Sequence, residues 1–430
     1  MLRHLQRLKK GATPARMRQL WYVPPLAAAM GLAMVRSLVM AHILSIGEFS
    51  RFSNGVLVSG SFCMLGCFGL QPLLQRGWPM MLVRGQEYRG LVLAAQANLI
   101  AVGCAALGLL LAGAGLSIGS ITPDILAVGL VHGLSLQLFI ISTIESRSRG
   151  HALLFAGQNF ARAAATLVLG VIAAVITHSA FVALLTEGSI MIVLSQVFFR
   201  TSTRYAAATT VAIYRLALNR FGKIDWGAAR MMMAVSTLGF IQYSVDRWLA
   251  SDRLDAASFA HYSFACIVLT TGQSVQALVN SSLYPFVARR RVQEGQRFAY
   301  KISLAISVAI FSISAAAAVP AYYILAYAIH NWYPQYDDVV RLLPLFLAIA
   351  MLRLSDFWIS FLLVAHREKL LFKLNLTATF VIIAGFAAYM HFAAGHVITM
   401  MDAGILAAAL TVATYFVTAT AAAFVGRQSC

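Results

Sequence analysis

Charged residues are scarce in this 430-residue chain, and acidic residues are the scarcest of them. Only 11% of the residues are charged, and Asp and Glu together number 15 against 33 Lys and Arg. Soluble domains average about 25% charged residues. With 60% hydrophobic residues and a mean hydropathy of +0.77, the composition excludes a soluble domain and indicates an integral membrane protein.

Cysteine and the motifs of catalytic or metal sites are also scarce. The five cysteines are Cys63, Cys67, Cys104, Cys266 and Cys430. Four lie in long apolar runs, so we expect no disulfide bond, and we interpret the Cys63–Cys67 pair as packing residues. The sequence has no nucleotide-binding loop, zinc motif or nucleophile elbow. We therefore expect no catalytic residue, no metal and no cofactor, and a protein that is not an enzyme.

Long apolar runs recur along the whole chain. Each is long enough to cross roughly 30 Å of hydrocarbon as a helix, and none has the short alternating pattern of an outer-membrane barrel. The sequence thus predicts an all-α integral membrane fold with twelve transmembrane helices. The predicted spans are about 20–43, 54–74, 91–113, 122–143, 152–175, 179–199, 229–250, 257–284, 301–328, 340–364, 371–391 and 403–425.

The basic residues are segregated between alternate connections of this twelve-span arrangement. The N-terminal tail, the even-numbered connections and the C-terminus carry 26 of the 33 Lys and Arg, whereas the odd-numbered connections carry only Arg51 and Arg253. The positive-inside rule then places both termini in the cytoplasm. The net charge of +18 is explained by this topology and by anionic membrane lipid, so we expect no nucleic-acid partner.

The longest connection divides the chain into two halves of six spans. We predict a basic cytoplasmic tail at 1–19, an N-terminal six-helix lobe at 20–199, a connector at 200–228, a C-terminal six-helix lobe at 229–425 and a tail at 426–430. Within the connector, residues 205–221 mix apolar side chains with arginines, which is typical of a helix lying in the membrane interface.

The two halves repeat the same short motifs. An intramembrane arginine recurs after 211 residues as Arg36 and Arg247, and the aromatic segment 49–53 recurs after 210 residues as 259–263. A Leu-x-Pro-x-x-x-Arg motif at 70–76 recurs after 213 residues at 283–289. Because both halves begin on the same side, they are predicted to be parallel repeats, an arrangement common among transporters.

These motifs carry a family resemblance. The turn after the first span reads Leu-Ser-Ile-Gly-Glu-Phe-Ser-Arg-Phe at 44–52, Asp246-Arg247 ends the seventh span, and Tyr284-Pro285 closes the eighth. In this pattern the chain resembles the polysaccharide repeat-unit flippases, which handle O-antigen or exopolysaccharide units. They belong to the multidrug/oligosaccharidyl-lipid/polysaccharide exporter superfamily, which has a MATE-like fold.

The resemblance implies a function. It implies a multi-pass protein of the bacterial inner membrane that moves an undecaprenyl-diphosphate-linked oligosaccharide from the cytoplasmic to the outer leaflet. Implied partners are that glycolipid, membrane lipid, and the polymerase and glycosyltransferases of the same pathway. The cycle would be alternating access, with one lobe rocking against the other.

Three intramembrane arginines fit this substrate. A charge at the bilayer centre costs about 2.5–3.5 kcal/mol on insertion scales and so indicates a function. We predict that Arg36, Arg247 and Arg353 line a basic cavity between the lobes, where guanidinium groups suit phosphate oxygens. Two alternatives stay open: Arg353 can pair with Asp356 on one helix face, and Arg247 can reach the outer interface.

A polar stripe and three acids complete the candidate site. Gln273, Gln276 and Asn280 share one helix face, where they would bind sugar hydroxyls or join neighbouring helices. The candidates for ion coupling or ion pairing are the three intramembrane acids. They are Asp246, Asp356 and Glu187.

Two other functions compete with the flippase. A cation-coupled multidrug exporter of the same superfamily would favour an acidic residue in the core of the first lobe, where this chain offers Arg36 and only Glu187 is acidic. A membrane glycosyltransferase or polymerase would need paired acids on a sizeable outer loop. The predicted outer loops are short, and their only such pair is Asp337-Asp338, which we interpret as part of a solvated loop.

Overall fold

The computed structural model describes the chain except for residues 1–20, 206–208, 393–396 and 428–430, and within the described part every named element is helical. The first lobe comprises α3 (Val23–Ile43), α4 (Ile46–Leu65), α5 (Leu70–Val83), α6 (Glu87–Gly113), α7 (Pro123–Ser148), α8 (Ala152–Thr177) and α9 (Ala180–Tyr205). The connector holds α10 (Thr210–Asn219) and η1 (Phe221–Lys223). The second lobe comprises α11 (Trp226–Arg253), α12 (Ala256–Glu294), α13 (Gln296–Trp332), η2 (Pro334–Arg341), α14 (Leu343–Leu354), α15 (Trp358–Val364), α16 (Glu368–Phe392) and α17 (Met400–Arg427).

The all-α membrane prediction is confirmed, and each of the twelve predicted spans falls on helical structure. By length and hydropathy, nine segments of the described chain can cross a membrane, and the bent pair α4–α5 raises this number to ten. The other two predicted spans coincide with α11 and α12, which are long enough but carry more polar side chains. Which side faces the cytoplasm stays a prediction.

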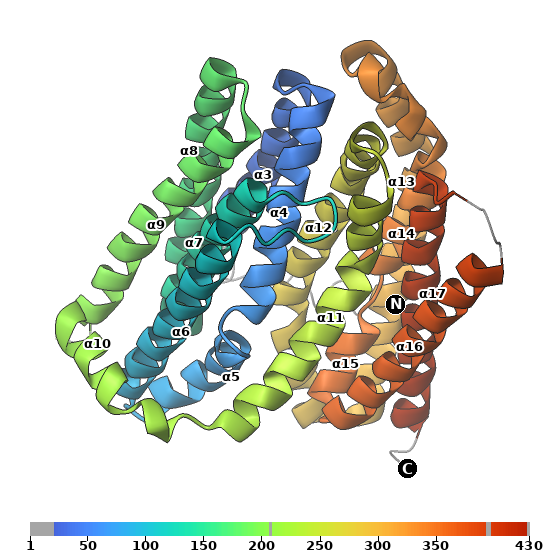
Figure 1. Cartoon of the computed structure of the whole chain (residues 1–430). Coiled ribbons are helices and arrows are strands. Elements are labelled where there is room, and N and C mark those ends of the chain that lie inside the picture. The colour runs from blue at the N-terminus through green and yellow to red at the C-terminus, as the bar shows by residue number, and fades with distance from the viewer. Residues whose placement is uncertain (1–20, 206–208, 393–396, 428–430) are drawn as a thin grey trace.

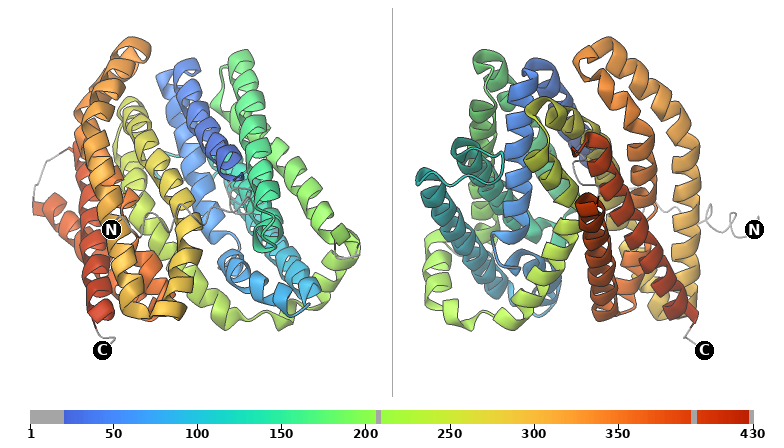
Figure 2. Two further views of the ribbon diagram at one scale, coloured as in Figure 1. Left: turned by 180° about the vertical axis from the view of Figure 1, so that it is seen from behind. Right: turned by 45° about the vertical axis from the view of Figure 1, so that its right-hand side comes forward.

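The helices form two groups with α11 between them. In Figure 1, α3 to α9 lie on the left, α12 to α17 lie on the right, and α11 runs diagonally from α10 toward the top. Seen from behind in Figure 2, α3 faces α12 across the boundary between the groups, and these two helices are in contact. We call the end with the α3–α4 and α11–α12 turns the hairpin end, and the end with α10 the connector end.

Short polar caps set where several helices begin. Ser45 precedes α4 and its hydroxyl accepts a hydrogen bond from the backbone N–H of Glu48 at 3.3 Å. Asp225 caps α11 through the N–H of Ala228, and Asp255 caps α12. Such residues satisfy the N–H groups that a first helical turn leaves free. The cap at Ser45 starts the second span about eight residues before its predicted apolar run at 54–74.

The hydrophobic core is continuous at one end of the molecule and divided at the other. At the hairpin end, one buried cluster joins residues of both lobes, including Phe49 and Ala41 of the first and Phe264 and Phe346 of the second. At the connector end the described residues form two clusters, one around Trp78 that joins the first lobe to α10 and the start of α11, and one around Phe361 within the second lobe. The lobes are therefore packed together at the hairpin end and share less core toward the connector end.

Candidate functional site

A cavity of about 210 Å³ lies between the two lobes, and we call it the chamber. Helices α3 and α4 form its wall on the first lobe, and α11 and α12 form its wall on the second. The chamber is lined by two arginines, several aromatic rings and several hydroxyl groups, and by no carboxylate of the described residues. Its lining residues are Arg36, Ser37, Phe49, Phe52, Ser53, Val56, Leu57, Gly60, Phe240, Ser244, Arg247, Phe259, Ser263, Cys266, Ile267 and Thr270.

The sequence repeat supplies matching positions on opposite walls of the chamber. Arg36 and Arg247 correspond in the repeat, and both line the chamber. On α4 the lining positions follow a helical spacing from Phe49 to Gly60, and the spacing recurs 210 residues later from Phe259 to Thr270, except that Tyr262, which matches Phe52, does not line the chamber. The aromatic motif thus places one face of α4 and one face of α12 against the same space.

Arg36 is shared between the chamber and the interior of the first lobe. Its Nη1 donates to Oε2 of Glu187 on α9 at 2.8 Å, and its guanidinium lies 5.7 Å from the ring centroid of Phe52. The Arg36 side chain keeps 15% exposure, whereas the Glu187 side chain has none. The arginine therefore lines the chamber while its carboxylate partner is enclosed behind it.

Glu187 also interacts with a histidine behind the chamber wall. Nε2 of His132 on α7 lies 3.2 Å from Oε2 of Glu187, and Nδ1 of His132 lies 2.7 Å from Oγ of Ser59. Oε1 of Glu187 has no hydrogen-bond partner among the described residues. A Cβ at Gly170 on α8 would lie 2.6 Å from that oxygen, so glycine is what lets α8 pack this closely.

In the second lobe, Asp246 and Arg247 are adjacent in sequence but differ in surroundings, because neighbouring helical side chains point about 100° apart. Arg247 lines the chamber. Asp246 is buried and accepts a hydrogen bond from the hydroxyl of Tyr262 at 2.6 Å. Nε of Arg247 and Oδ1 of Asp246 have no hydrogen-bond partner among the described residues.

Arg353 lies in a separate, much smaller cavity and not in the chamber. This cavity of about 20 Å³ is enclosed by α11, α14, α15 and α17. Nε of Arg353 donates to the hydroxyl of Thr411 at 3.2 Å, and the guanidinium lies 4.8 Å from the ring centroid of Tyr243. No ion pair joins Arg353 and Asp356 among the described residues, because the helix breaks between α14 and α15 and interrupts their common face.

The predicted amide stripe is not among the residues that line the chamber. Nε2 of Gln276 donates to the backbone oxygen of Asp356 at 3.2 Å. This amide therefore forms a hydrogen bond with the non-helical segment that separates α14 from α15. Gln273 is half-buried on the same helix, and the side chain of Asn280 lies outside the described ones. The chamber instead presents hydroxyl groups, and those of Ser37, Ser244 and Ser263 were not predicted as ligands from the sequence. Their spacing from Arg247 and from the aromatic motif was the signal available.

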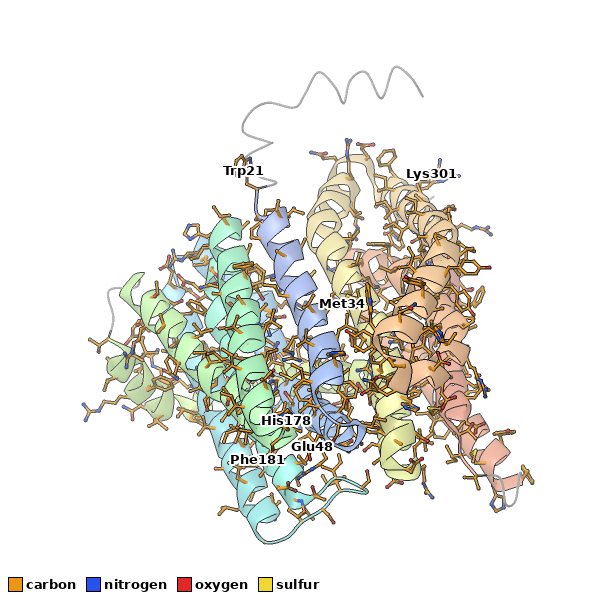
Figure 3. The ribbon with its side chains drawn as sticks, turned by 90° about the horizontal axis from the view of Figure 1, so that it is seen from above. Trp21, Met34, Glu48, His178, Phe181 and Lys301 are labelled. Carbon is orange, nitrogen blue, oxygen red and sulfur yellow. The ribbon has the colours of Figure 1, made fainter. Side chains whose placement is uncertain are left out.

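A largely apolar groove of about 410 Å³ lies next to the chamber, between α3 and α12. The two spaces share the lining residues Arg36, Ser37, Val56 and Thr270, so they adjoin at the charged side. Away from the shared residues the groove is mainly apolar. Met34, which Figure 3 labels on α3 on the side toward α12, is one of its lining residues.

The hairpin end of the chamber is closed by contacts between the lobes. Oγ of Ser251 donates to Oδ1 of Asn54 at 2.7 Å, and the ring of Tyr336 meets the ring of Phe49 edge-on at 5.7 Å between centroids. The Tyr336 hydroxyl also donates to the backbone oxygen of Ala41 on α3. Nearby, Glu48 accepts a hydrogen bond from the N–H of Ala180, and Figure 3 shows Glu48 beside the α8–α9 turn.

The chamber is suited to binding an anionic group that is surrounded by apolar and aromatic side chains. Two guanidinium groups supply fixed positive charge and fork-shaped donors, and the hydroxyls supply further hydrogen bonds. Among the described residues, no group of three or more His, Cys, Asp or Glu is placed to hold a metal ion.

Comparisons with known proteins identify the fold. No protein-family model and no curated protein sequence matches the chain. Solved structures do match: the eukaryotic MATE transporter AtDTX14 has a TM-score of 0.58 at 11% identity, covering 96% of each chain. A MATE protein in complex with Br-NRF has a TM-score of 0.53 at 14% identity, covering 95% of this chain and 94% of the other. The MATE multidrug transporter DinF-BH has a TM-score of 0.53 at 12% identity, covering 97% of this chain and 96% of the other. The chain therefore has the fold of the MATE transporters.

Proposed function

We propose that this protein is a flippase that moves a polyprenyl-diphosphate-linked oligosaccharide across a bacterial inner membrane. The observation that carries the proposal is the charge of the chamber: Arg36 and Arg247 line it from opposite lobes, and no carboxylate of the described residues does. Whatever oligosaccharide it carries, such a glycolipid has a charged diphosphate between its prenyl chain and its sugar. Guanidinium groups bind phosphate oxygens through two parallel hydrogen bonds and stay charged at any relevant pH.

The adjoining groove supports a lipid-linked cargo. It meets the chamber at Arg36 and is otherwise mainly apolar, as a prenyl chain requires. With the diphosphate at the two arginines, the sugar head would occupy the chamber and its hydroxyl-rich wall, while the prenyl tail would leave along α3 and α12. The substrate would enter from the cytoplasm, where we place the connector end, and leave when the hairpin end opens. Pathway polymerases and glycosyltransferases are its proposed partners.

A cation-coupled multidrug exporter is the second candidate, and it is favoured by the fold. The neighbours named as multidrug transporters share the architecture of this chain over nearly its whole length. The rings of Phe49, Phe52, Phe240 and Phe259 give the chamber an aromatic surface that could stack with a flat organic molecule. The two functions differ in the charge of the cargo, which is anionic for the flippase and commonly cationic for drug export.

The decisive experiment compares both cargoes on the same purified protein. The protein is reconstituted into vesicles with a fluorescent prenyl diphosphate, and dithionite then reports how fast the fluorophore changes leaflet. A cationic rhodamine dye is assayed in parallel. We expect transport of the prenyl diphosphate and a loss of at least about tenfold in Arg36→Ala, since hydrogen bonds to charged groups contribute about 1.5–3 kcal/mol.

The matched control is Arg215→Ala, which removes an equal charge from an exposed position on α10. This variant should transport at the wild-type rate. Transport of the rhodamine dye without transport of the prenyl diphosphate would establish the drug exporter instead. Full prenyl-diphosphate transport by Arg36→Ala would remove this residue from the binding site.

A further inference from the structure

The carboxylate of Glu187 is held by one group that faces the chamber and one that does not. Its Oε2 lies 2.8 Å from Nη1 of Arg36, which lines the chamber, and 3.2 Å from Nε2 of His132, which is buried behind the wall. An anionic ligand in the chamber would use the same guanidinium that neutralises Glu187. Ligand and carboxylate therefore compete for Arg36.

We propose that Glu187 and His132 form a proton-binding site whose occupancy is linked to the chamber through Arg36. When a diphosphate group pairs with Arg36, the guanidinium is drawn away from Glu187. A carboxylate that is fully enclosed and has lost its cation is strongly destabilised, and it is neutralised by taking up a proton from solvent. The proton is taken up on the carboxyl group of Glu187, beside Nε2 of His132, which lies 3.2 Å from Oε2. This inference rests on the proposed function, because it assigns the anion that Arg36 binds.

The groups around Glu187 leave Arg36 as its only ion-paired arginine among the described residues. Helix α7 contributes His132, and α4 contributes Ser59, which bonds the far nitrogen of that imidazole. Helix α8 brings Gly170 against Oε1, where a Cβ on that glycine would lie 2.6 Å from the oxygen. Arg162 on α8 interacts electrostatically with Arg36 and Glu187, but its guanidinium lies 5.1 Å from the ring centroid of Phe139 and forms no ion pair with Glu187 in the described structure.

Thermodynamic linkage fixes the sign of the effect. If anion binding promotes proton uptake, then proton uptake promotes anion binding by the same factor. Affinity for a diphosphate should therefore rise as the pH falls. Glu187→Gln, which keeps the shape of the side chain but is always neutral, should bind the anion tightly at every pH. A typical coupling between sites predicts a difference of about tenfold.

The first experiment counts protons. Purified protein in nanodiscs is titrated with farnesyl diphosphate by calorimetry at one pH, in two buffers of different ionisation enthalpy. Because farnesyl diphosphate binds protons itself, the informative quantity is the difference between wild type and Glu187→Gln. We expect more proton uptake and a steeper pH dependence of affinity in the wild type. Glu145→Gln is the control, since Glu145 is a buried acid of the same lobe that pairs with Arg149 away from the chamber. Equal proton uptake in wild type and Glu187→Gln would overturn the proposal.

The second experiment needs no ligand. Arg36→Gln removes the cation while keeping a polar side chain, and infrared spectroscopy then detects any protonated carboxyl group by its C=O stretch. We expect a band in Arg36→Gln that is absent from wild type and from the double variant Arg36→Gln/Glu187→Gln. Absence of the band would mean that Arg162 and His132 suffice to keep Glu187 ionised, and the proton site would be refuted. Failure of farnesyl diphosphate to bind the wild type would instead count against the proposed function, and this second experiment would still decide the proton site.

Discussion

At the scale of single residues, the two chamber arginines differ from lysine in shape more than in charge. A guanidinium presents a rigid planar fork that matches two phosphate oxygens, whereas an ammonium is a point charge. We therefore expect Arg247→Lys to bind farnesyl diphosphate more weakly than wild type but more tightly than Arg247→Ala, with steps of about tenfold. Calorimetric titration of the three proteins measures this order. Equal affinity of Arg247→Lys and wild type would show that charge alone suffices.

A second residue-scale prediction concerns the buried bond between Asp246 and Tyr262. The tyrosine hydroxyl donates to Oδ2 of Asp246 at 2.6 Å, and both residues are buried. Tyr262→Phe leaves a buried carboxylate without its donor, and unmet buried polar groups cost about 1–3 kcal/mol or more when charged. We expect a clear fall in the thermal unfolding temperature in detergent. Tyr323→Phe, at a position 68% exposed, should unfold like wild type.

At the scale of elements, the bend between α4 and α5 contains two residues with positive φ, Phe68 and Gly69, and Gly69 packs against the backbone of α11. The two helices meet at 52°, and Gly69 has φ +79° at the bend. A Cβ there would overlap the backbone of α11, lying 2.5 Å from the nitrogen of Met233 and closer still to the carbonyl oxygen of Ala229. Only glycine combines this backbone conformation with such a close approach.

A non-glycine residue in a left-handed conformation costs about 1–3 kcal/mol. Gly69→Ala should lower the free energy of unfolding by more than this, because the methyl group also overlaps α11. Gly85→Ala is the matched control, because Gly85 has φ +64° but an added Cβ there would meet no atom within 4 Å. Thermal unfolding in detergent compares the two variants. Similar losses of stability in both would mean that α11 moves aside to accommodate the methyl group.

The positions of the membrane helices could be predicted from the sequence, but the positions where a helix is interrupted could not. Length and hydropathy predict where helices cross, since an apolar run has to satisfy its own backbone in lipid. The break at Ser355–Phe357 carries no proline or glycine, and it arises where Gln276 bonds the backbone of Asp356. Such long-range contacts are invisible to local pattern, and so the observed surroundings of Arg353 differ from the predicted ones.

The candidate site was predictable to the extent that the repeat encodes it. Arg36 and Arg247 each lie within a long apolar segment, at corresponding positions of the two repeats, and both line the chamber. The partner of Arg36 was not predictable, because Glu187 is 151 residues away on α9. Only the packing of α3, α7, α8 and α9 brings the arginine, the histidine and the carboxylate together.

At the scale of the whole molecule, the closed hairpin end and the divided core at the connector end correspond to one state of the alternating-access cycle that we propose. Alternating access requires the hairpin end to open while the lobes come together at the other end. The hydrogen bond between Asn54 and Ser251 crosses the two lobes at the end that has to open. A covalent bond in its place would hold this state.

A cysteine pair tests that requirement. In a background whose natural cysteines are replaced, Asn54→Cys/Ser251→Cys should form a disulfide on oxidation, abolish leaflet exchange of the prenyl diphosphate, and regain it on reduction. Binding of farnesyl diphosphate should survive, because the chamber is already formed in this state. The control pair, Gln71→Cys/Gln137→Cys, replaces a 3.0 Å hydrogen bond within the first lobe. In the proposed cycle each lobe moves as a body, so oxidation of this pair should leave transport intact. Full transport by the cross-linked Asn54→Cys/Ser251→Cys protein would mean that the lobes need not separate at the hairpin end, and that the cargo takes another route.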